Sequence, residues 1–162
     1  GCDPDRDAIL PGYTCETLNV STHEKRYGGG HIHFGFSPEW IKSIHENLYN
    51  PLVRLLAITC GNINISTTKY PELEIERANY YGKPGRFRLQ KHGIEYRTPS
   101  NSWVTNNKAI ELMFDGGKLA FELLCKPEKG KHIIDTYLES TVNSILTANK
   151  LLSAEILREI GI

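Results

Sequence analysis

Residues 80–103, with the sequence YYGKPGRFRLQKHGIEYRTPSNSW, hold more turn-forming and ionisable side chains per position than any other part of the chain. The run Gly82-Lys83-Pro84-Gly85 predicts a sharp turn of the backbone. Arg86 and Arg88 follow this turn two positions apart, which places both guanidinium groups on one side of an extended segment. The pattern therefore predicts a strand that directs two cations toward one place.

The second half of this stretch, residues 93–98, alternates as a half-buried strand does. The side chains that face one way are Ile94, Tyr96 and Thr98. Glu95 and Arg97 face the other way, so a carboxylate and a guanidinium group share a face. The same pattern is typical of an exposed strand face with cross-strand ion pairs, and the stretch alone leaves both interpretations open.

A second strand-like stretch, GGGHIHFGF at residues 28–36, begins with a run of glycines. Its apolar side chains fall on one face: Ile32, Phe34 and Phe36. His31 and His33 fall together on the other face, where two neutral imidazoles can reach one divalent cation. The glycines leave room for a ligand close to the backbone. A pair of ordinary half-buried strand histidines is the alternative interpretation.

In this order and spacing, the two stretches resemble the bacteriophage carboxylate-amine ligase family, also called the COOH-NH2 ligase or amidoligase type. This family is related to glutamine synthetase and glutamate-cysteine ligase. The resemblance covers residues 1 to about 103 and extends to the helical region beyond. It implies a glutamine-synthetase-like catalytic domain, whose antiparallel sheet holds divalent cations, nucleotide and the acceptor carboxylate.

The resemblance also implies roles for individual residues. The expected ligands of Mg²⁺ or Mn²⁺ are His31, His33 and Glu95. The residues expected to hold ATP are His33, Lys83, Arg88 and Arg97. The arginines expected to stabilise the transferring phosphoryl group in catalysis are Arg86, Arg88 and Arg97. Ser100 and Asn101, which follow the Glu-x-Arg strand, are expected to orient the substrate.

The chain departs from the family pattern at its N-terminal end. Full-length members carry an upstream strand with acidic residues that complete the metal site, whereas this sequence opens at Gly1 without an initiator Met. We therefore expect an N-terminally truncated chain that lacks the first strands of the sheet. The aspartates at positions 3, 5 and 7 lack the glycine and distal glutamate of a calcium loop, and we interpret them as a solvated turn.

Length and composition bound the class of protein. The 162 residues, 40% of them apolar, suffice for one core, so we expect a single domain over residues 1–162. The 19 basic and 19 acidic side chains cancel, and no apolar run spans a bilayer, so neither nucleic acid nor a membrane is an expected partner. The cysteines at positions 2, 15, 60 and 125 lack zinc-site spacing and follow no secretory segment. We expect reduced thiols in a cytoplasmic protein.

The remaining elements are predicted from hydrophobic spacing and capping residues. Ser37 and Pro38 mark the start of an amphipathic helix through residues 41–56 that kinks near Pro51 and ends before Gly61. Further helices are predicted over residues 108–114, 119–124 and 133–146, with Gly116-Gly117 as a break or bend and a last short helix capped by Ser153. The predicted non-helical segments are a strand at 62–66, a polar connection at 67–76 with Arg77 on the surface, and a loop at 127–130. Together these elements predict an α+β fold with helices on one face of a largely antiparallel sheet.

Three functions remain open. The first is an ATP-dependent ligase that joins a small-molecule or peptide carboxylate to an amine through an acyl phosphate, which requires no protein nucleophile. The second is a non-catalytic binding or assembly module, motivated by the missing acidic strand. The third is a metal-dependent hydrolase that uses the histidine pair and Glu95, although no general base is evident. No Walker-type glycine loop is present.

The ligase hypothesis makes a geometric prediction. His31 and Glu95 should lie on one face of one sheet, with Arg86 or Arg88 at its rim. The apolar side chains of the two strands should turn to the opposite face, under the helix of residues 41–56: Ile32, Phe34, Ile94 and Tyr96.

Overall fold

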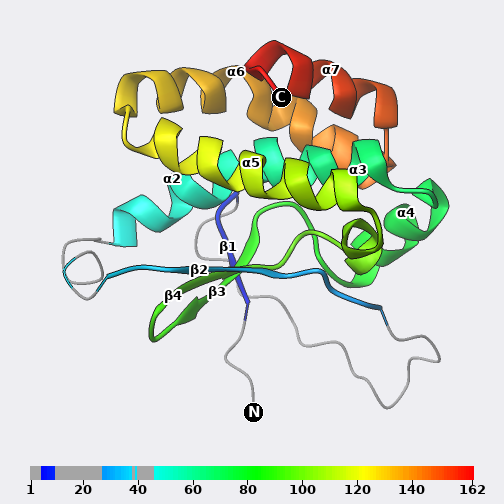
Figure 1. Cartoon of the computed structure of the whole chain (residues 1–162), viewed down its shortest axis with the longest axis horizontal. Helices are drawn as coiled ribbons and strands as arrows, with labels where there is room; N and C mark the ends of the chain where they lie inside the picture. Colours follow the sequence, from blue (N-terminus) through cyan, green and yellow to red (C-terminus); the bar gives the residue numbers. More distant parts are fainter. Residues whose placement is uncertain (1–4, 10–26, 38, 40–45) are drawn as a thin grey trace.

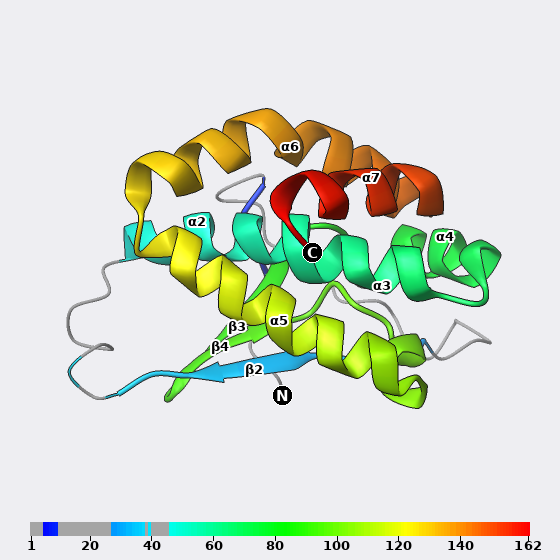
Figure 2. The same cartoon turned by 45° about the horizontal axis from the view of Figure 1, so that its top comes forward.

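The computed structural model describes residues 5–9, 27–37, 39 and 46–162. It is an α+β fold in which the sheet forms one layer and helices are stacked on one of its faces (Figure 1). The helices form two further layers, with α2, α3 and α5 next to the sheet and α6 and α7 beyond them (Figures 1 and 2). The predicted fold class is confirmed.

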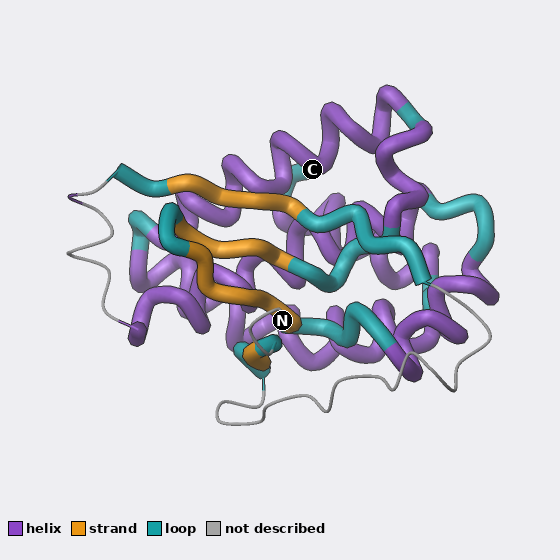
Figure 3. Tube along the Cα trace, turned by 90° about the horizontal axis from the view of Figure 1, so that it is seen from below, coloured by secondary structure: helices purple, strands orange, loops and turns teal. Residues whose placement is uncertain are grey.

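The sheet has four antiparallel strands in the order β1-β3-β4-β2. The strands are β1 (Arg6–Asp7), β2 (Ile32–Gly35), β3 (Arg86–Gln90) and β4 (Gly93–Tyr96). Strands β3 and β4 form a hairpin, and β2 pairs with β4 so that His33 lies opposite Glu95 and Ile32 opposite Tyr96. Seen from below, the sheet lies in front of the helices (Figure 3).

The hydrophobic core lies between the sheet and the first helical layer. Ile94 and Tyr96 of β4 are fully buried there against residues of α2 such as Leu52. Ile32 and Phe34 of β2 pack against the same core. The prediction for the apolar face of both strands is therefore confirmed.

One long helical segment crosses the middle of the molecule. It consists of α2 (Glu46–Leu56), a π-helical stretch η1 (Ala57–Gly61) and α3 (Asn62–Thr67), and Pro51 lies inside α2. The predicted start of this helix falls at Pro38 and residues 40–45, outside the described residues.

The predictions of a helix end before Gly61 and of a strand at residues 62–66 are wrong, because the segment stays helical. The alternating asparagines that suggested a strand are buried, and Asn62 Nδ2 donates to the Ile58 carbonyl at 2.8 Å and to Thr141 Oγ1 at 2.9 Å. Partners on other helices thus satisfy polar groups that would otherwise disfavour a buried helix.

Residues 67–76 are not a simple polar connection. Helix α4 (Pro71–Tyr80) begins within them, with proline in its first turn followed by Glu72 and Glu74, which suit the positive end of the helix dipole. Leu73 and Ile75 are exposed, so α4 lacks the apolar stripe that identifies most helices. This is why hydrophobic spacing missed it.

Helix α5 (Asn107–Leu124) runs through Gly116-Gly117 without a break. The glycines serve close packing: a Cβ at Gly116 would lie 2.6 Å from Ile63 Cδ1, and one at Gly117 would lie 3.2 Å from Phe34 Cε1. The short 3-10 helix η2 (Asn101–Thr105) precedes α5.

The last two helices differ from prediction at their starts. The predicted loop at 127–130 is the first turn of α6 (Pro127–Thr147), because proline fits the first helical position. Helix α7 (Lys150–Ile160) is capped by Asn149, whose side chain accepts from the Leu152 amide at 3.1 Å. Ser153, the predicted cap, is instead buried and donates to Asn62 Oδ1 at 3.0 Å.

Two further observations concern the predicted environment. Within the described part of the chain, none of the helices has the length and apolar character needed to cross a bilayer. Cys60 is buried, Cys125 is exposed, and both are free thiols. Burial raises the pKa of the Cys60 thiol to about 12. Cys2 and Cys15 lie outside the described residues.

Candidate active site

The sheet face that the helices leave uncovered carries the candidate site (Figure 3). Because Ile94 and Tyr96 point into the core, Glu95 and the following Arg97 point to this opposite face, where both side chains are nevertheless buried. His31 precedes β2 and reaches the same face, where its Nδ1 lies 2.7 Å from Glu95 Oε1. The predicted convergence of His31 and Glu95 is confirmed.

Glu95 is the centre of the network, although its residue is only 5% exposed. Its Oε1 accepts from Arg97 Nη1 at 2.6 Å as well as from His31. Its Oε2 accepts from Gln90 Nε2 at 3.0 Å and lies 3.6 Å from Arg88 Nη1. Both carboxylate oxygens therefore interact with side chains from β3, from the residue just before β2 and from the residue just after β4.

Asp5 joins the same network from the other end of the sheet. Its Oδ1 lies 3.1 Å from Arg88 Nη2 and 3.0 Å from Arg97 Nε. The following strand β1 pairs with β3, and Asp7 is buried with its Oδ2 3.6 Å from Arg86 Nε. The interpretation of these aspartates as a solvated turn is wrong for Asp5 and Asp7. Asp3 lies outside the described residues.

Tyr81 is a member of the site that sequence reasoning missed. Arg97 Nη2 donates to the Tyr81 hydroxyl oxygen at 2.6 Å, and that oxygen lies 2.8 Å from His31 Nε2. If Tyr81 donates its proton to Nε2, then Nδ1 of His31 carries the hydrogen that faces Glu95. Tyr81 directly follows α4 and shows no periodic signal of its own. Its position beside Gly82, which adopts a φ of 73°, is the only local hint.

Burial and neighbouring charges set the protonation states of this network. Burial, reinforced by the Arg97 charge, lowers the pKa of His31 despite the opposing effect of Glu95. Burial raises the pKa of Glu95, but Arg97 and the hydrogen bonds from Arg97 and Gln90 outweigh it, so the pKa is lowered overall. Burial also raises the pKa of Tyr81. At neutral pH the site therefore holds ionised Glu95 beside neutral His31 and Tyr81.

Other predicted site residues lie apart from this network. His33 is exposed and stacks on His92, with ring centroids 6.3 Å apart. Lys83 is exposed on the turn before β3. Arg86 is only 2% exposed, so it supports β1 through Asp7 rather than facing a ligand.

The glycine run does not leave the open space that the sequence suggested. A Cβ at Gly30 would lie 2.1 Å from the Ser100 carbonyl oxygen, and one at Gly29 would lie 2.1 Å from His31 Nε2. Protein atoms fill this space, because the backbone of Gly30 is hydrogen-bonded to Pro99 and Trp103. The glycines thus allow close approach of chain segments.

The described residues do not fit a resident metal ion. Among them no group of three or more His, Cys, Asp or Glu side chains is arranged to hold one. Glu95 is already shared between Arg97, His31 and Gln90, and His33 turns toward His92. The guanidinium groups of Arg88 and Arg97 converge on this face, and they are the described side chains there that suit an anion.

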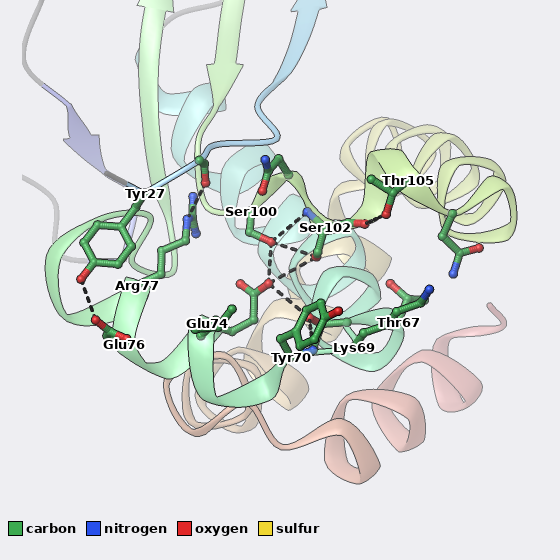
Figure 4. Close-up of a pocket in the computed structure, with 15 residues that line it drawn as sticks. Tyr27, Thr67, Lys69, Tyr70, Glu74, Glu76, Arg77, Ser100, Ser102 and Thr105 are labelled. Atoms are coloured by element: carbon green, nitrogen blue, oxygen red, sulfur yellow. Dashed lines mark hydrogen bonds between the residues drawn. The ribbon is translucent and has the colours of Figure 1, made fainter. Parts of the chain in front are cut away.

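A pocket of about 550 Å³ lies beyond the end of β4, between α4, the end of α3 and η2 (Figure 4). The predicted substrate-orienting residues Ser100 and Asn101 both line it. Arg77 also lines it but is 5% exposed, which contradicts its predicted surface position. Its guanidinium group donates to the carbonyls of Gly28, Thr98 and Pro99 at 2.7–3.0 Å.

The fold and site define an α+β protein with a charged, hydrogen-bonded network on the sheet face opposite the helices. The family model described as phage phiEco32-like COOH.NH2 ligase-type 2 matches residues 10–132. The chain therefore belongs to this family, whose name is that of a carboxylate-amine ligase. Comparison with curated proteins and with solved structures found no match to the chain.

Proposed function

We propose that this protein is an ATP-dependent ligase that forms an amide bond between a carboxylate and an amine through an acyl phosphate. The observation that carries the proposal is the convergence of Arg88 and Arg97 on one sheet face, where Glu95 and Asp5 fix both guanidinium groups. Membership of a carboxylate-amine ligase family supports the reaction class.

The reaction has two steps. A carboxylate oxygen of the substrate attacks the γ-phosphorus of ATP, the bond to the β,γ-bridging oxygen breaks, and ADP leaves. The amine then attacks the carbonyl carbon of the acyl phosphate, inorganic phosphate leaves with the former carboxylate oxygen, and the amine nitrogen releases a proton. No step requires a nucleophile from the protein.

The chain's own contribution is electrostatic. Arg88 and Arg97 would stabilise the charge that spreads over the transferring phosphoryl group, because their positions are fixed before the reaction begins. Lys83 and His33 are exposed and would contact the nucleotide at the edge of this face. Mg²⁺ or Mn²⁺ belongs to the proposal as a companion of the ATP phosphates, which would supply part of its oxygen ligands.

The test supplies ATP, Mg²⁺ and hydroxylamine with a panel of amino acids and peptides as carboxylates. We expect a hydroxamate and ADP in equal amounts, and one ¹⁸O atom from a labelled carboxylate in the released phosphate. Arg88→Gln should lower the turnover by about 100-fold. The matched control, Arg158→Gln on the exposed surface of α7, should not change it.

ADP release that depends on neither the carboxylate nor hydroxylamine would contradict the proposal. A binding module without turnover is the second candidate, favoured by the full engagement of Glu95 within the protein. Calorimetry that shows ATP binding in a chain that forms no hydroxamate with any carboxylate would select this alternative.

A further inference from the structure

Glu74 lies at the centre of the pocket between α4 and η2, where its carboxylate meets Ser100 and Ser102 (Figure 4). The side chain is 6% exposed. Its Oε1 accepts from the hydroxyls of Ser100, Ser102 and Thr68, the latter two at 3.3 and 3.4 Å. Its Oε2 accepts from Asn64 Nδ2 at 3.2 Å. Glu74 is thus held rigidly in place by neutral donors.

No described cation forms an ion pair with this carboxylate, although Arg77 is near enough for its charge to interact with Glu74. Within the described residues Glu74 has no ion-pair partner closer than 4.0 Å. Arg77 directs its donors to backbone carbonyls, and Glu76 accepts from the Tyr27 hydroxyl at the edge of the pocket (Figure 4). Lys69 is exposed at the rim. A cationic ligand, which would add a charge-assisted hydrogen bond to Glu74, should therefore bind more tightly than a neutral one.

The pocket is connected to the candidate active site through the chain itself. Ser100 follows Arg97 by three residues, which is roughly 10 Å of extended backbone. Arg77, in the pocket wall, holds the Thr98 and Pro99 carbonyls of this connection and lies against the Tyr81 ring, 5.1 Å from its centroid. A ligand in the pocket would thus sit beside the end of the strand that carries Glu95 and Arg97.

We propose that this pocket binds the amine substrate as a primary ammonium group held by Glu74; the assignment as substrate rests on the proposed ligase function. Its volume of about 550 Å³ lies in the usual range for small-molecule sites. Exposed apolar surface on Tyr70 and Leu73 at the pocket rim provides contacts for the carbon skeleton of the amine. The hydroxyls of Ser100 and Ser102 set the orientation of the carboxylate.

The experiment titrates the protein with glycinamide, a cationic primary amine, and follows the backbone amide signals of residues 100–102 by NMR without nucleotide. We expect millimolar binding of this small ligand and none of N-acetylglycinamide, which lacks the cation. Glu74→Gln should weaken glycinamide binding about tenfold. The matched control is Glu72→Gln, at an exposed position two residues before Glu74 on the same helix and outside the pocket. It should leave the affinity for glycinamide unchanged.

Equal binding of the acetylated probe, or unchanged affinity in Glu74→Gln, would overturn the proposal. If Glu74→Gln does not fold, the variant Lys69→Glu at the exposed rim replaces it. The added negative charge should tighten glycinamide binding several-fold. An unchanged affinity would overturn the proposal. Failure of the ligase proposal gives another result: glycinamide still binds to the pocket, but the assay with hydroxylamine yields no hydroxamate. If instead Glu74→Gln retains full turnover with an unchanged KM for the amine, the pocket assignment fails and the ligase function stands.

Discussion

Glu95 connects more of the candidate site than any other single residue described. Its two oxygens link Arg97, His31, Gln90 and Arg88, which come from three different segments of the sheet. A buried carboxylate of this kind contributes little net stability as an ion pair, but its loss leaves Arg88 and Arg97 with only Asp5 as a carboxylate partner. Its main effect is therefore to fix the positions of the two arginines.

We expect Glu95→Gln to lower the free energy of unfolding by about 2 kcal/mol, because the variant removes one of the two carboxylate charges that compensate Arg97 while keeping the side-chain shape. Urea denaturation measures the change. The control is Glu111→Gln, whose side chain is 70% exposed on α5, and it should alter stability by less than about 0.5 kcal/mol. Equal effects of the two substitutions would show that the Glu95 network does not hold the sheet face.

His31 should make stability depend on pH. The pKa of His31 is lower in the folded chain than its ordinary value of 6.5. When the pH falls below 6.5, His31 therefore binds a proton in the unfolded chain before it does so in the folded chain. The contribution of neutral His31 is thus complete above about pH 6.5 and decreases at lower pH. Unfolding measured from about pH 7 to 5 should show a smaller loss of stability for His31→Gln than for the unchanged chain. His132→Gln, exposed on α6, should retain the original slope, and a His31 variant with that same slope would refute the assignment.

At the scale of elements, close helix packing explains features that look like breaks in the sequence. In α5, Gly116 brings the helix against Ile63 of α3, and Gly117 brings it against Phe34 of β2. Ile63 belongs to the hydrophobic core, and Phe34 packs against it. The two glycines therefore join the sheet, the central helical segment and α5.

Gly116→Ala tests this role. Alanine favours a helix over glycine by about 1 kcal/mol, but its Cβ would lie 2.6 Å from Ile63 Cδ1 in a fully buried environment. Because overpacking costs about 1–3 kcal/mol, we expect net destabilisation in thermal or urea unfolding. Asp115→Ala, next to it but exposed, serves as the control and should change stability little. A Gly116→Ala protein more stable than the original would contradict the close contact.

On the scale of the whole molecule, the segment from α2 through η1 to α3 lies between the sheet and the outer helices (Figures 1 and 2). Residues 55–65 are buried without exception. Local opening of this segment would disrupt all three layers, so its backbone hydrogen bonds should open only on global unfolding.

Hydrogen exchange followed by mass spectrometry can measure this property. We expect the slowest exchange in peptides that cover residues 52–65 and faster exchange in α7, whose outer side is exposed. The comparison is internal to one protein and needs no variant. Faster exchange in residues 52–65 than in α7 would mean that the outer helices, rather than the central segment, form the most stable unit.

The sequence by itself determined which side chains share a face of the sheet. The alternation in residues 93–98 and around His31 has a period of two, so Ile94 and Tyr96 had to be buried together and Glu95 and Arg97 had to point the other way. The turn at Gly82–Gly85 was equally predictable, because two of its glycines adopt positive φ angles that other residues disfavour. These features depend on neighbours in sequence.

Only the tertiary structure decided what completes the site. Asp5 meets Arg88 across 83 residues of sequence, Tyr81 meets His31 across 50, and Glu74 meets Ser100 across 26. The helical state of Asn62 likewise depends on Thr141 and Ser153, which belong to α6 and α7. No local pattern encodes such pairs, because burial and hydrogen bonding to distant partners override the intrinsic preferences of a short segment.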